Sequence, residues 1–339
     1  MKDIRIYNFD RSQDFLVIQS IVSHMRDVKE FYISRSWDRG PSVVVTFGDS
    51  VDENFLLTFK SQIQNVMKQI HVSDEDSVKV KEQYMKSLRS IAELEQKNAF
   101  EQFKNHGDIE ISDNTFSYFN PALTEIIHNM RFDLQPVLQE IYLYTNERDV
   151  QLYDLYPVLF HNVSELYKEG TKNKGYFSYI SHVHGFLELA GKQSLNFTED
   201  SFEEMFTNHF PKMKENENEH FEIIMKWEEA WQLIYKKYKP LIIDNVDNEY
   251  NNNIDKTISE LEQNFTNDFH ERFVMYYKST DFVSNMDATT YRFIVNVLYL
   301  SLPFLRISAL KKQHLIYMSY RFTEEKYNLK WRKELGVEA

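Results

Sequence analysis

The stretch that decides the fold is FYISRSWDRGPSVVVTF, residues 31–47. Aromatic and β-branched residues fill both of its ends, and residues of these kinds favour strands. Between them, residues 38–41 (DRGP) carry turn chemistry, because glycine permits a positive φ and proline fixes φ and donates no N–H. The stretch therefore predicts a β-hairpin. Side chains alternate along a strand, so Ser42, Val44 and Thr46 share one face of its second strand.

The segments around the hairpin predict a small sheet backed by helices. Residues 3–8 alternate as a strand does, and residues 15–22 have helical periodicity. Asp52 is a good N-cap for a helix whose apolar residues recur from 55 to 70. Residues 74–104 are charged and helical in pattern, and a further strand is expected within 107–121. The order β-α-β-β-α predicts a mixed or antiparallel sheet.

From residue 122 onward the pattern is helical almost throughout. Breaks are expected at Pro211, at Pro240 and in the polar run 244–253 (DNVDNEYNNN), which reads as a surface loop. The expected helices span 122–143, 149–169, 176–192, 199–208, 218–237, 254–278, 287–302 and 307–327. The predicted class is therefore α+β, with a sheet-containing region at 1–121 and a helical region at 122–339 that form one integrated domain.

Composition excludes several functions. The 339 residues contain no Cys, which rules out disulfides, thiolate catalysis and Cys-ligated metal centres. The net charge of −13 argues against non-specific binding of nucleic acid or of an anionic membrane by the whole surface. No apolar run approaches the roughly 18 residues of a membrane helix. We expect a soluble cytoplasmic protein, and nothing in the sequence suggests a metal or an organic cofactor.

Arg35 is the first candidate for a functional residue, because it lies in an apolar strand close to Trp37. One interpretation is a buried ion pair with an acidic residue, since buried arginine is usually paired. The other is a guanidinium fork that binds a carboxylate or amide oxygen of a substrate. The sequence leaves both open.

The helix predicted at 307–327 is the second candidate. His314, Tyr317 and Arg321 follow one another at i, i+3 and i+7 and so share a face. Together they could supply a proton donor or acceptor and an anion clamp. An amphipathic helix with a polar rim explains the pattern equally well. His182 and His184 are two positions apart, which disfavours a shared metal ion on a helix and favours a structural histidine there.

Taken together, these stretches resemble the C-terminal domain of lantibiotic dehydratases, in the thiopeptide-type bacteriocin biosynthesis family. The first motif of that family reads Phe-Ile-Arg-Tyr, a short turn, and Gly-Pro-His-Leu-Arg-Leu-Arg. Residues 32–35 (YISR) and 40–46 (GPSVVVT) occupy this pattern here. Weaker likeness lies in Ser181-His182, in 291–299 (YRFIVNVLY) and in 317–327, where the family often has the Glu-Glu found at 324–325.

Members that eliminate glutamate from glutamylated Ser and Thr use the arginines of the first motif and a histidine of the last helix. This chain keeps Arg35 but has Ser42 for the histidine, and Val44 and Thr46 for the two later arginines. Expelling a glutamate needs cationic help, so these departures count against that reaction. The chain more closely resembles stand-alone thiopeptide pyridine synthases, which join two dehydroalanines in a formal aza-[4+2] cycloaddition. Loss of water and of the leader peptide then leaves a pyridine-centred macrocycle.

The resemblance implies roles for named residues. Arg35 would orient a backbone carbonyl, and Tyr317 or His314 would shuttle protons. The residues expected to bind the peptide are Trp37, Arg39, Ser42, Thr46 and Arg321.

The implied partners are a modified precursor peptide with its leader, a glutamylating dehydratase or azole-forming enzymes of the same pathway, and a second copy in a homodimer. Two alternatives stay open. One is a glutamate-eliminating lyase that partners a split dehydratase, with Arg35 and His314 as its catalytic pair. The other is a non-catalytic scaffold that binds a leader peptide along the edge of the sheet.

Overall fold

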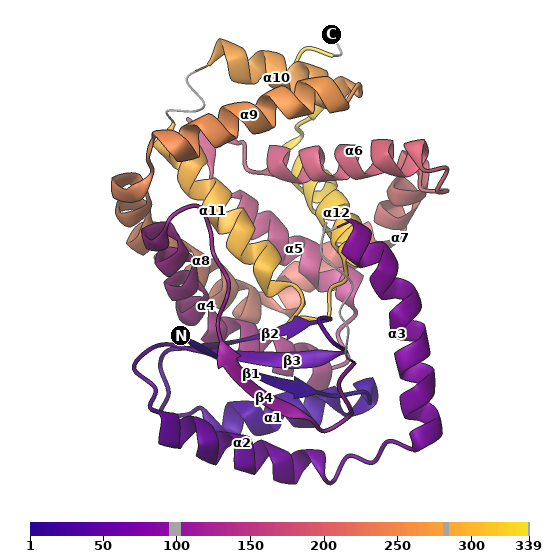
Figure 1. The fold of residues 1–339 in the computed structure, drawn as a ribbon. Coiled ribbons are helices and arrows are strands. Elements are labelled where there is room, and N and C mark those ends of the chain that lie inside the picture. The colour runs from indigo at the N-terminus through magenta and orange to yellow at the C-terminus, as the bar shows by residue number, and fades with distance from the viewer. Residues whose placement is uncertain (95–102, 281–284, 338–339) are drawn as a thin grey trace. The chain divides into compact units, whose positions relative to one another are not determined.

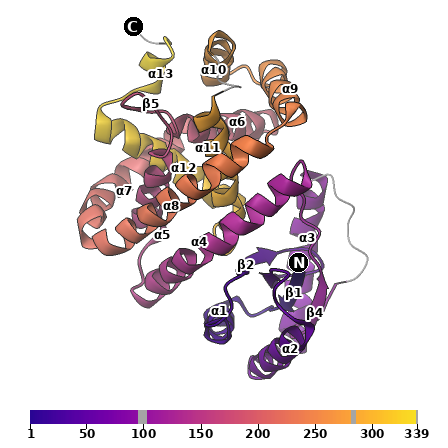
Figure 2. The ribbon, with the colours of Figure 1, turned by 90° about the vertical axis from the view of Figure 1, so that its left-hand side faces the viewer.

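The computed structural model describes residues 1–94, 103–280 and 285–337. They form two compact units, which differ in character (Figures 1 and 2). The first unit consists of Met1–Phe116 with Pro303–Arg306 and contains a sheet; the second consists of Ser117–Leu302 with Ile307–Ala339 and is helical. The predicted α+β class is confirmed.

The sheet of the first unit has four strands: β1 (Lys2–Tyr7), β2 (Phe31–Ser36), β3 (Ser42–Phe47) and β4 (Ile109–Asp113). Their spatial order is β2-β3-β1-β4, and every neighbouring pair is antiparallel. The hairpin and the added fourth strand are confirmed. At the hairpin turn Arg39 has φ 58° and Gly40 has φ 127°. Gly40 is required there, because an L side chain is strained at that φ.

Helices α1 (Asp14–His24) and α2 (Glu53–Met67) cover one face of this sheet (Figure 1). A short 3₁₀ turn, η1 (Arg11–Gln13), precedes α1. The side chain of Asp52 accepts a hydrogen bond from the Phe55 N–H at 2.7 Å, which confirms the predicted N-cap. Phe47 packs its ring against Phe59 of α2. The third helix, α3 (Asp74–Leu94), covers part of the predicted helix at 74–104, of which residues 95–102 lie outside the described residues.

The second unit is built around α12 (Ala309–Tyr327), which packs against α5, α6 and α7. A second layer is formed by α8, which packs against α4 and α11 (Figure 2). Trp227 and Trp231 of α8 are buried in this core, as expected from their i,i+4 spacing. The elements are α4 (Pro121–Glu147), α5 (Leu152–Ser164), β5 (Lys168–Glu169), β6 (Lys172–Asn173), α6 (Tyr176–Lys192), α7 (Glu199–Glu219), α8 (Phe221–Asn245), α9 (Asn248–Asn264), α10 (Asp268–Ser279), α11 (Met286–Ser301), α12 and α13 (Trp331–Glu334).

Four predictions about where helices break are wrong. Helices α7 and α8 continue through Pro211 and Pro240, because buried residues on the far side of each proline keep the chain on the core. The polar run 244–253 is mostly helical, since the Asp247 side chain accepts from the Tyr250 N–H at 2.8 Å and begins α9. The single helix expected at 254–278 is two, α9 and α10, separated at residues 265–267.

The hydropathy of the described helices does not indicate a membrane-spanning segment. None of them is both long enough and apolar enough to cross a bilayer.

Candidate functional site

A cavity of about 710 Å³ lies within the helical unit. Its wall comes chiefly from α6, α9, α10 and α11, with further residues from the segment before α4, from the segment 167–174 and from α12. Ligand pockets of small molecules have volumes in this range and are mostly apolar with a few placed polar groups. The cavity has that composition, and the side chains below give it its chemistry.

Aromatic rings form most of the cavity wall. Phe119 and Tyr250 pack edge to face with ring centroids 4.8 Å apart, and Phe265 stacks on His270 at 4.7 Å. Helices α9 and α10 close this side with a small apolar cluster centred on Ile258 and Val274. Flat rings pack well in stacked or edge-to-face contacts with other rings. The wall therefore suits a ligand that carries flat, apolar groups.

Arg292 of α11 supplies a cation among the tyrosines of this wall. Burial raises the pKa of both Tyr118 and Tyr250, and the Arg292 guanidinium counteracts part of that rise. The Tyr118 hydroxyl also accepts a hydrogen bond from Asn296 Nδ2 at 2.7 Å. The phenols are neutral at physiological pH, so they can donate protons in hydrogen bonds but do not carry negative charge.

Ser181 and His182 lie side by side on α6 and both line the cavity. Ser181 Oγ is 3.1 Å from Nε2 of His270 on α10. The His182 ring packs edge to face on Tyr299, with centroids 5.0 Å apart. Part of its surface is exposed at the cavity, and the protein atoms packed around the rest of the ring, with the nearby Lys312, lower the pKa of His182. His182 is thus a neutral imidazole that faces the cavity.

Lys312 lies at the start of α12, next to the cavity residue Gln313. Its ammonium sits 4.6 Å from the centroid of the Tyr299 ring. Burial lowers the pKa of Lys312, because the charged form loses hydration. Gln313 Oε1 is buried and has no hydrogen-bond partner among the described residues. Gln313 therefore offers an acceptor to a polar ligand group at this part of the cavity wall.

Arg35, the first residue predicted from the sequence, lies in the sheet unit. Its guanidinium donates to the Asp14 carboxylate of α1 at 2.5 Å. Arg35 pairs across the ladder with Val43, so it faces the helices that cover the sheet. This is the geometry of the buried ion pair that the sequence left open. A catalytic role for Arg35 stays a prediction.

Ser42 and Thr46 face the opposite side of the sheet from Arg35. Thr46 Oγ1 donates to Asp3 at 2.8 Å, and Ser42 Oγ donates to the Ser36 carbonyl at 3.2 Å. On this face Val44 pairs with Arg5 of β1. The guanidinium of Arg5 therefore lies beside Val44, the position at which the first motif of the resembled family has an arginine.

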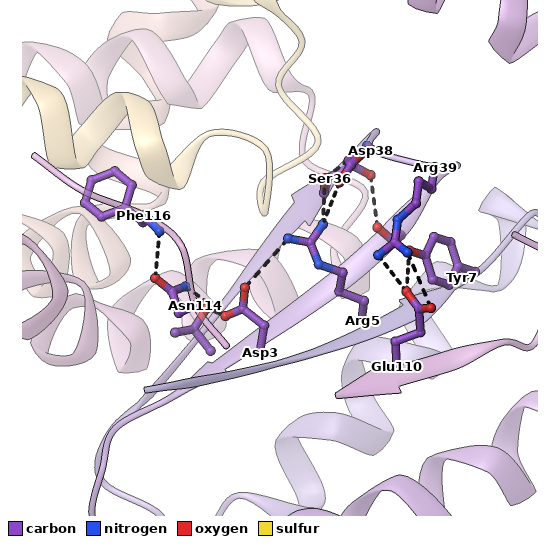
Figure 3. A network of polar contacts seen from close by, with 11 residues as sticks. Asp3, Arg5, Tyr7, Ser36, Asp38, Arg39, Glu110, Asn114 and Phe116 are labelled. Carbon is purple, nitrogen blue, oxygen red and sulfur yellow. Dashed lines mark hydrogen bonds and ion pairs between the residues drawn. The ribbon is translucent and has the colours of Figure 1, made fainter. Parts of the chain in front are cut away.

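The charge of Arg5 is largely offset by its neighbours (Figure 3). Arg5 lies 3.8 Å from Asp3 and 3.7 Å from Asp38. Arg39, predicted to bind the peptide, pairs with Glu110 at 2.7 Å, and Trp37 is half-buried beside the turn. The guanidinium groups of Arg5 and Arg39 are thus both offset by carboxylates, which agrees with the argument from Val44 and Thr46.

The residues predicted on the last helix are only partly brought together. Tyr317 and Arg321 both bind Glu203 of α7, at 2.7 Å and 2.9 Å. They line a separate, polar hollow of about 320 Å³. His314 does not join them, and its Nδ1 lies 3.3 Å from the Tyr153 hydroxyl. It lines neither that hollow nor the aromatic cavity. Their catalytic and binding roles stay predictions.

Several cavity residues were not singled out from the sequence. Arg292 and Asn296 are four positions apart inside an apolar helix, which is a usable signal for a polar stripe facing a site. His270 follows Ser181 by 89 residues and gives no local signal. Among the described residues, no group of three or more His, Asp or Glu side chains is arranged to hold a metal ion.

Comparison with solved structures finds the same fold in other proteins. The pyridine synthase TbtD from thiomuracin biosynthesis matches with a TM-score of 0.63 and 12% identity, over 97% of this chain and 99% of that chain. TsrL matches with a TM-score of 0.56 and 13% identity, over 99% of this chain and 97% of that one. No protein-family model matches the chain, and no curated protein sequence matches it. At these identities the likeness concerns the fold, so membership of the dehydratase-related family stays a prediction.

Proposed function

We propose that this chain is a peptide-modifying enzyme of thiopeptide-type biosynthesis, and that it forms a pyridine by joining two dehydroalanines. The observation that carries the proposal is the aromatic cavity of the helical unit, with neutral His182 and Ser181 facing it. The fold shared with a pyridine synthase supports the same reaction class. We place the chemistry at the cavity because Arg35 is already held by Asp14 and Tyr317 by Glu203.

The proposed reaction does not require strongly charged catalytic groups. One dehydroalanine unit shifts a proton from its amide nitrogen to the preceding carbonyl oxygen and becomes the imidic-acid 2-azadiene. Two C–C bonds then form between the alkene of the second dehydroalanine and the terminal carbons of the azadiene, which are its CH2 carbon and the former carbonyl carbon. Loss of water and of the leader peptide, as its amide, makes the ring aromatic. The protein must bring the two alkenes together and move protons.

The cavity supplies both requirements. Stacking of azole rings on Phe119 and Phe265 would fold the peptide so that its two dehydroalanines meet. His182 is neutral and can donate one proton and accept another. Removing it should lower kcat by at least about 100-fold, the usual contribution of general acid–base catalysis.

The test is turnover of a dehydrated, azole-containing precursor peptide, followed by mass spectrometry. Cyclised core with released leader is expected for the wild type, and little of it for His182→Gln. His209→Gln, which alters a histidine outside the cavity lining, is the matched control and should keep wild-type kcat. Arg35→Lys and Tyr317→Phe test the residues expected from the sequence.

Other products would redirect the proposal. Loss of glutamate from a glutamylated peptide would indicate the lyase alternative instead of cyclisation. An unchanged peptide that nevertheless binds would indicate the scaffold alternative. Full activity of His182→Gln with cyclisation by the wild type would overturn the placement of the chemistry at His182.

A further inference from the structure

The cavity contains a chain of hydrogen bonds that runs from Ser181 away from the cavity into the protein. It passes from Ser181 to His270, then to Asn267, and ends at Glu188. We propose that Ser181 is a second proton-accepting side chain of this cavity, beside His182, and that His270, Asn267 and Glu188 are positioning residues that hold it in that role. The substrate named below rests on the proposed function.

The direction of the chain is set at its far end by Glu188. Its carboxylate accepts from the backbone N–H of Thr266 at 3.1 Å and of Asn267 at 3.2 Å. It also binds Asn267 Nδ2 at 2.6 Å. Burial raises the pKa of Glu188, but hydrogen bonds from Lys192, Asn267 and Thr266 outweigh it and hold that pKa at about 2. An ionised carboxylate only accepts, so the amide nitrogen of Asn267 must point to Glu188.

The amide oxygen of Asn267 then points to His270. It accepts from the His270 backbone N–H at 3.1 Å and lies 2.9 Å from Nδ1 of the ring. An amide oxygen cannot donate, so Nδ1 of His270 carries the ring proton. Burial keeps His270 neutral by lowering its pKa to about 4, and Phe265 stacks on the ring and holds its plane. Nε2 is therefore an unprotonated acceptor.

Ser181 faces that acceptor. Its Oγ lies 3.1 Å from Nε2 of His270, and Nε2 has no proton to give, so the hydroxyl proton of Ser181 points to His270. Toward the cavity Ser181 presents only oxygen lone pairs. It can accept a hydrogen bond from a ligand N–H or O–H and has no proton of its own to offer that ligand. A hydroxyl without His270 behind it would rotate freely between the two roles.

On the proposed substrate, the matching donor is the amide N–H of the dehydroalanine that becomes the azadiene. That proton moves to Ser181 Oγ while the Ser181 proton moves to His270 Nε2. Both transfers then reverse, and the proton is returned to the carbonyl oxygen of the same amide. The substrate becomes its imidic-acid tautomer, and the protein recovers its starting protonation. Neither an oxidant nor a further reactant is needed.

The same bonds also fasten α6 to the turn between α9 and α10, so a purely structural role must be distinguished. The tautomer of His270 in the substrate-free protein distinguishes the two roles. Nitrogen-15 NMR of histidine-labelled wild-type protein should show His270 protonated at Nδ1 and unprotonated at Nε2. Glu188→Gln frees the Asn267 amide to turn over and should weaken this preference, whereas Asn267→Asp keeps an acceptor for Nδ1 and should retain it.

Kinetics supply the second readout. Ser181→Ala and His270→Phe should each lower kcat by about 100-fold, with KM changed by less than about 3-fold, because they remove proton transfer and leave the aromatic wall. Ser181→Thr keeps the hydroxyl and should recover much of the loss. Ser259→Ala, on the exposed face of α9, is the matched control and should match the wild type.

Two results would overturn the assignment. One is a wild-type His270 protonated at Nε2, whatever the activity. The other is full kcat for Ser181→Ala in a wild-type background that cyclises the peptide. A wild type that cyclises nothing would instead refute the proposed function. In that case, an azole-containing peptide that binds without moving the Nε2 resonance of His270 would refute the role of Ser181 as well.

Discussion

At the scale of single residues, Asp14 is the polar centre of the sheet unit. The residue is only 5% exposed. It receives hydrogen bonds from Asn8 Nδ2 at 2.7 Å and from Arg35 at 2.5 Å, and Arg306 lies 3.4 Å away. Taking a carboxylate out of water is costly unless such partners compensate it, and here they also fix the entry into α1.

We predict that Asp14→Asn lowers the free energy of unfolding by about 3 kcal/mol, because it leaves the half-buried Arg35 guanidinium without its counter-charge. Urea unfolding followed by circular dichroism measures the change. Asp113→Asn removes the exposed partner of Lys2 and, as the control, should leave the urea unfolding curve close to that of the wild type. Adding Arg35→Met to Asp14→Asn should recover part of the loss. A loss below about 1 kcal/mol for Asp14→Asn would contradict the importance of this pair.

The fate of Arg35 shows what sequence can and cannot establish about a residue. Its position in a strand, next to a tight turn, was predictable from local chemistry. Its partner was not, because Asp14 is one of 52 acidic residues and is chosen by the packing of α1 on the sheet. Ser181 and His182 were noticed as a pair through the resemblance to the dehydratase-related family. His270, 89 residues later, could be connected to Ser181 only in three dimensions.

At the scale of elements, α6 determines the size of the cavity through Gly185. A Cβ placed on this residue would lie 3.4 Å from the Phe265 ring and 3.6 Å from the His270 ring. Those are ordinary contact distances, so a methyl group fits there, and a longer side chain must extend into the cavity. Glycine within a helix also costs stability relative to alanine, because it loses more backbone freedom on folding.

We predict that Gly185→Ala raises the free energy of unfolding by up to about 1 kcal/mol, as alanine favours the helix. Gly185→Leu should instead fill the cavity and abolish binding of an azole-containing peptide, while the far-ultraviolet circular dichroism spectrum stays unchanged. Calorimetric melting and isothermal titration measure the two effects. Tight peptide binding by a folded Gly185→Leu protein would show that the ligand does not enter this cavity.

Most helices of the second unit were predictable, since a long amphipathic pattern indicates a helix even where single residues within it disfavour one. The errors lie at those exceptions. Pro211 and Pro240 each remove one helical hydrogen bond, yet Met213 and Ile242 are buried beyond them and keep the helices continuous. The polar composition of 244–253 concealed Tyr250, which is buried and anchors α9. In each case tertiary packing overrode a local preference.

At the scale of the whole molecule, buried histidines make stability depend on pH. Burial, with minor help from Lys326, lowers the pKa of His161 to about 3, and burial lowers the pKa values of His184 and His270 to about 4. An unfolded chain has histidine pKa values near 6.5. Between these limits the unfolded state binds more protons than the folded state, so stability must fall as the pH falls.

The predicted free energy of unfolding is level above about pH 7.5 and declines below about pH 6.5, by up to roughly 1.4 kcal/mol per pH unit for each buried histidine. Urea unfolding at pH 8, 7, 6 and 5 gives the slope. His161→Leu should flatten that slope by about one proton, because Thr323, which accepts from His161 Nδ1, still donates to the Ser319 carbonyl. Val163→Ala destabilises the same helix without removing a titrating group, so its curve should lie lower with an unchanged slope. Equal slopes in the wild type and His161→Leu would show that His161 is protonated to the same extent in the folded and unfolded states.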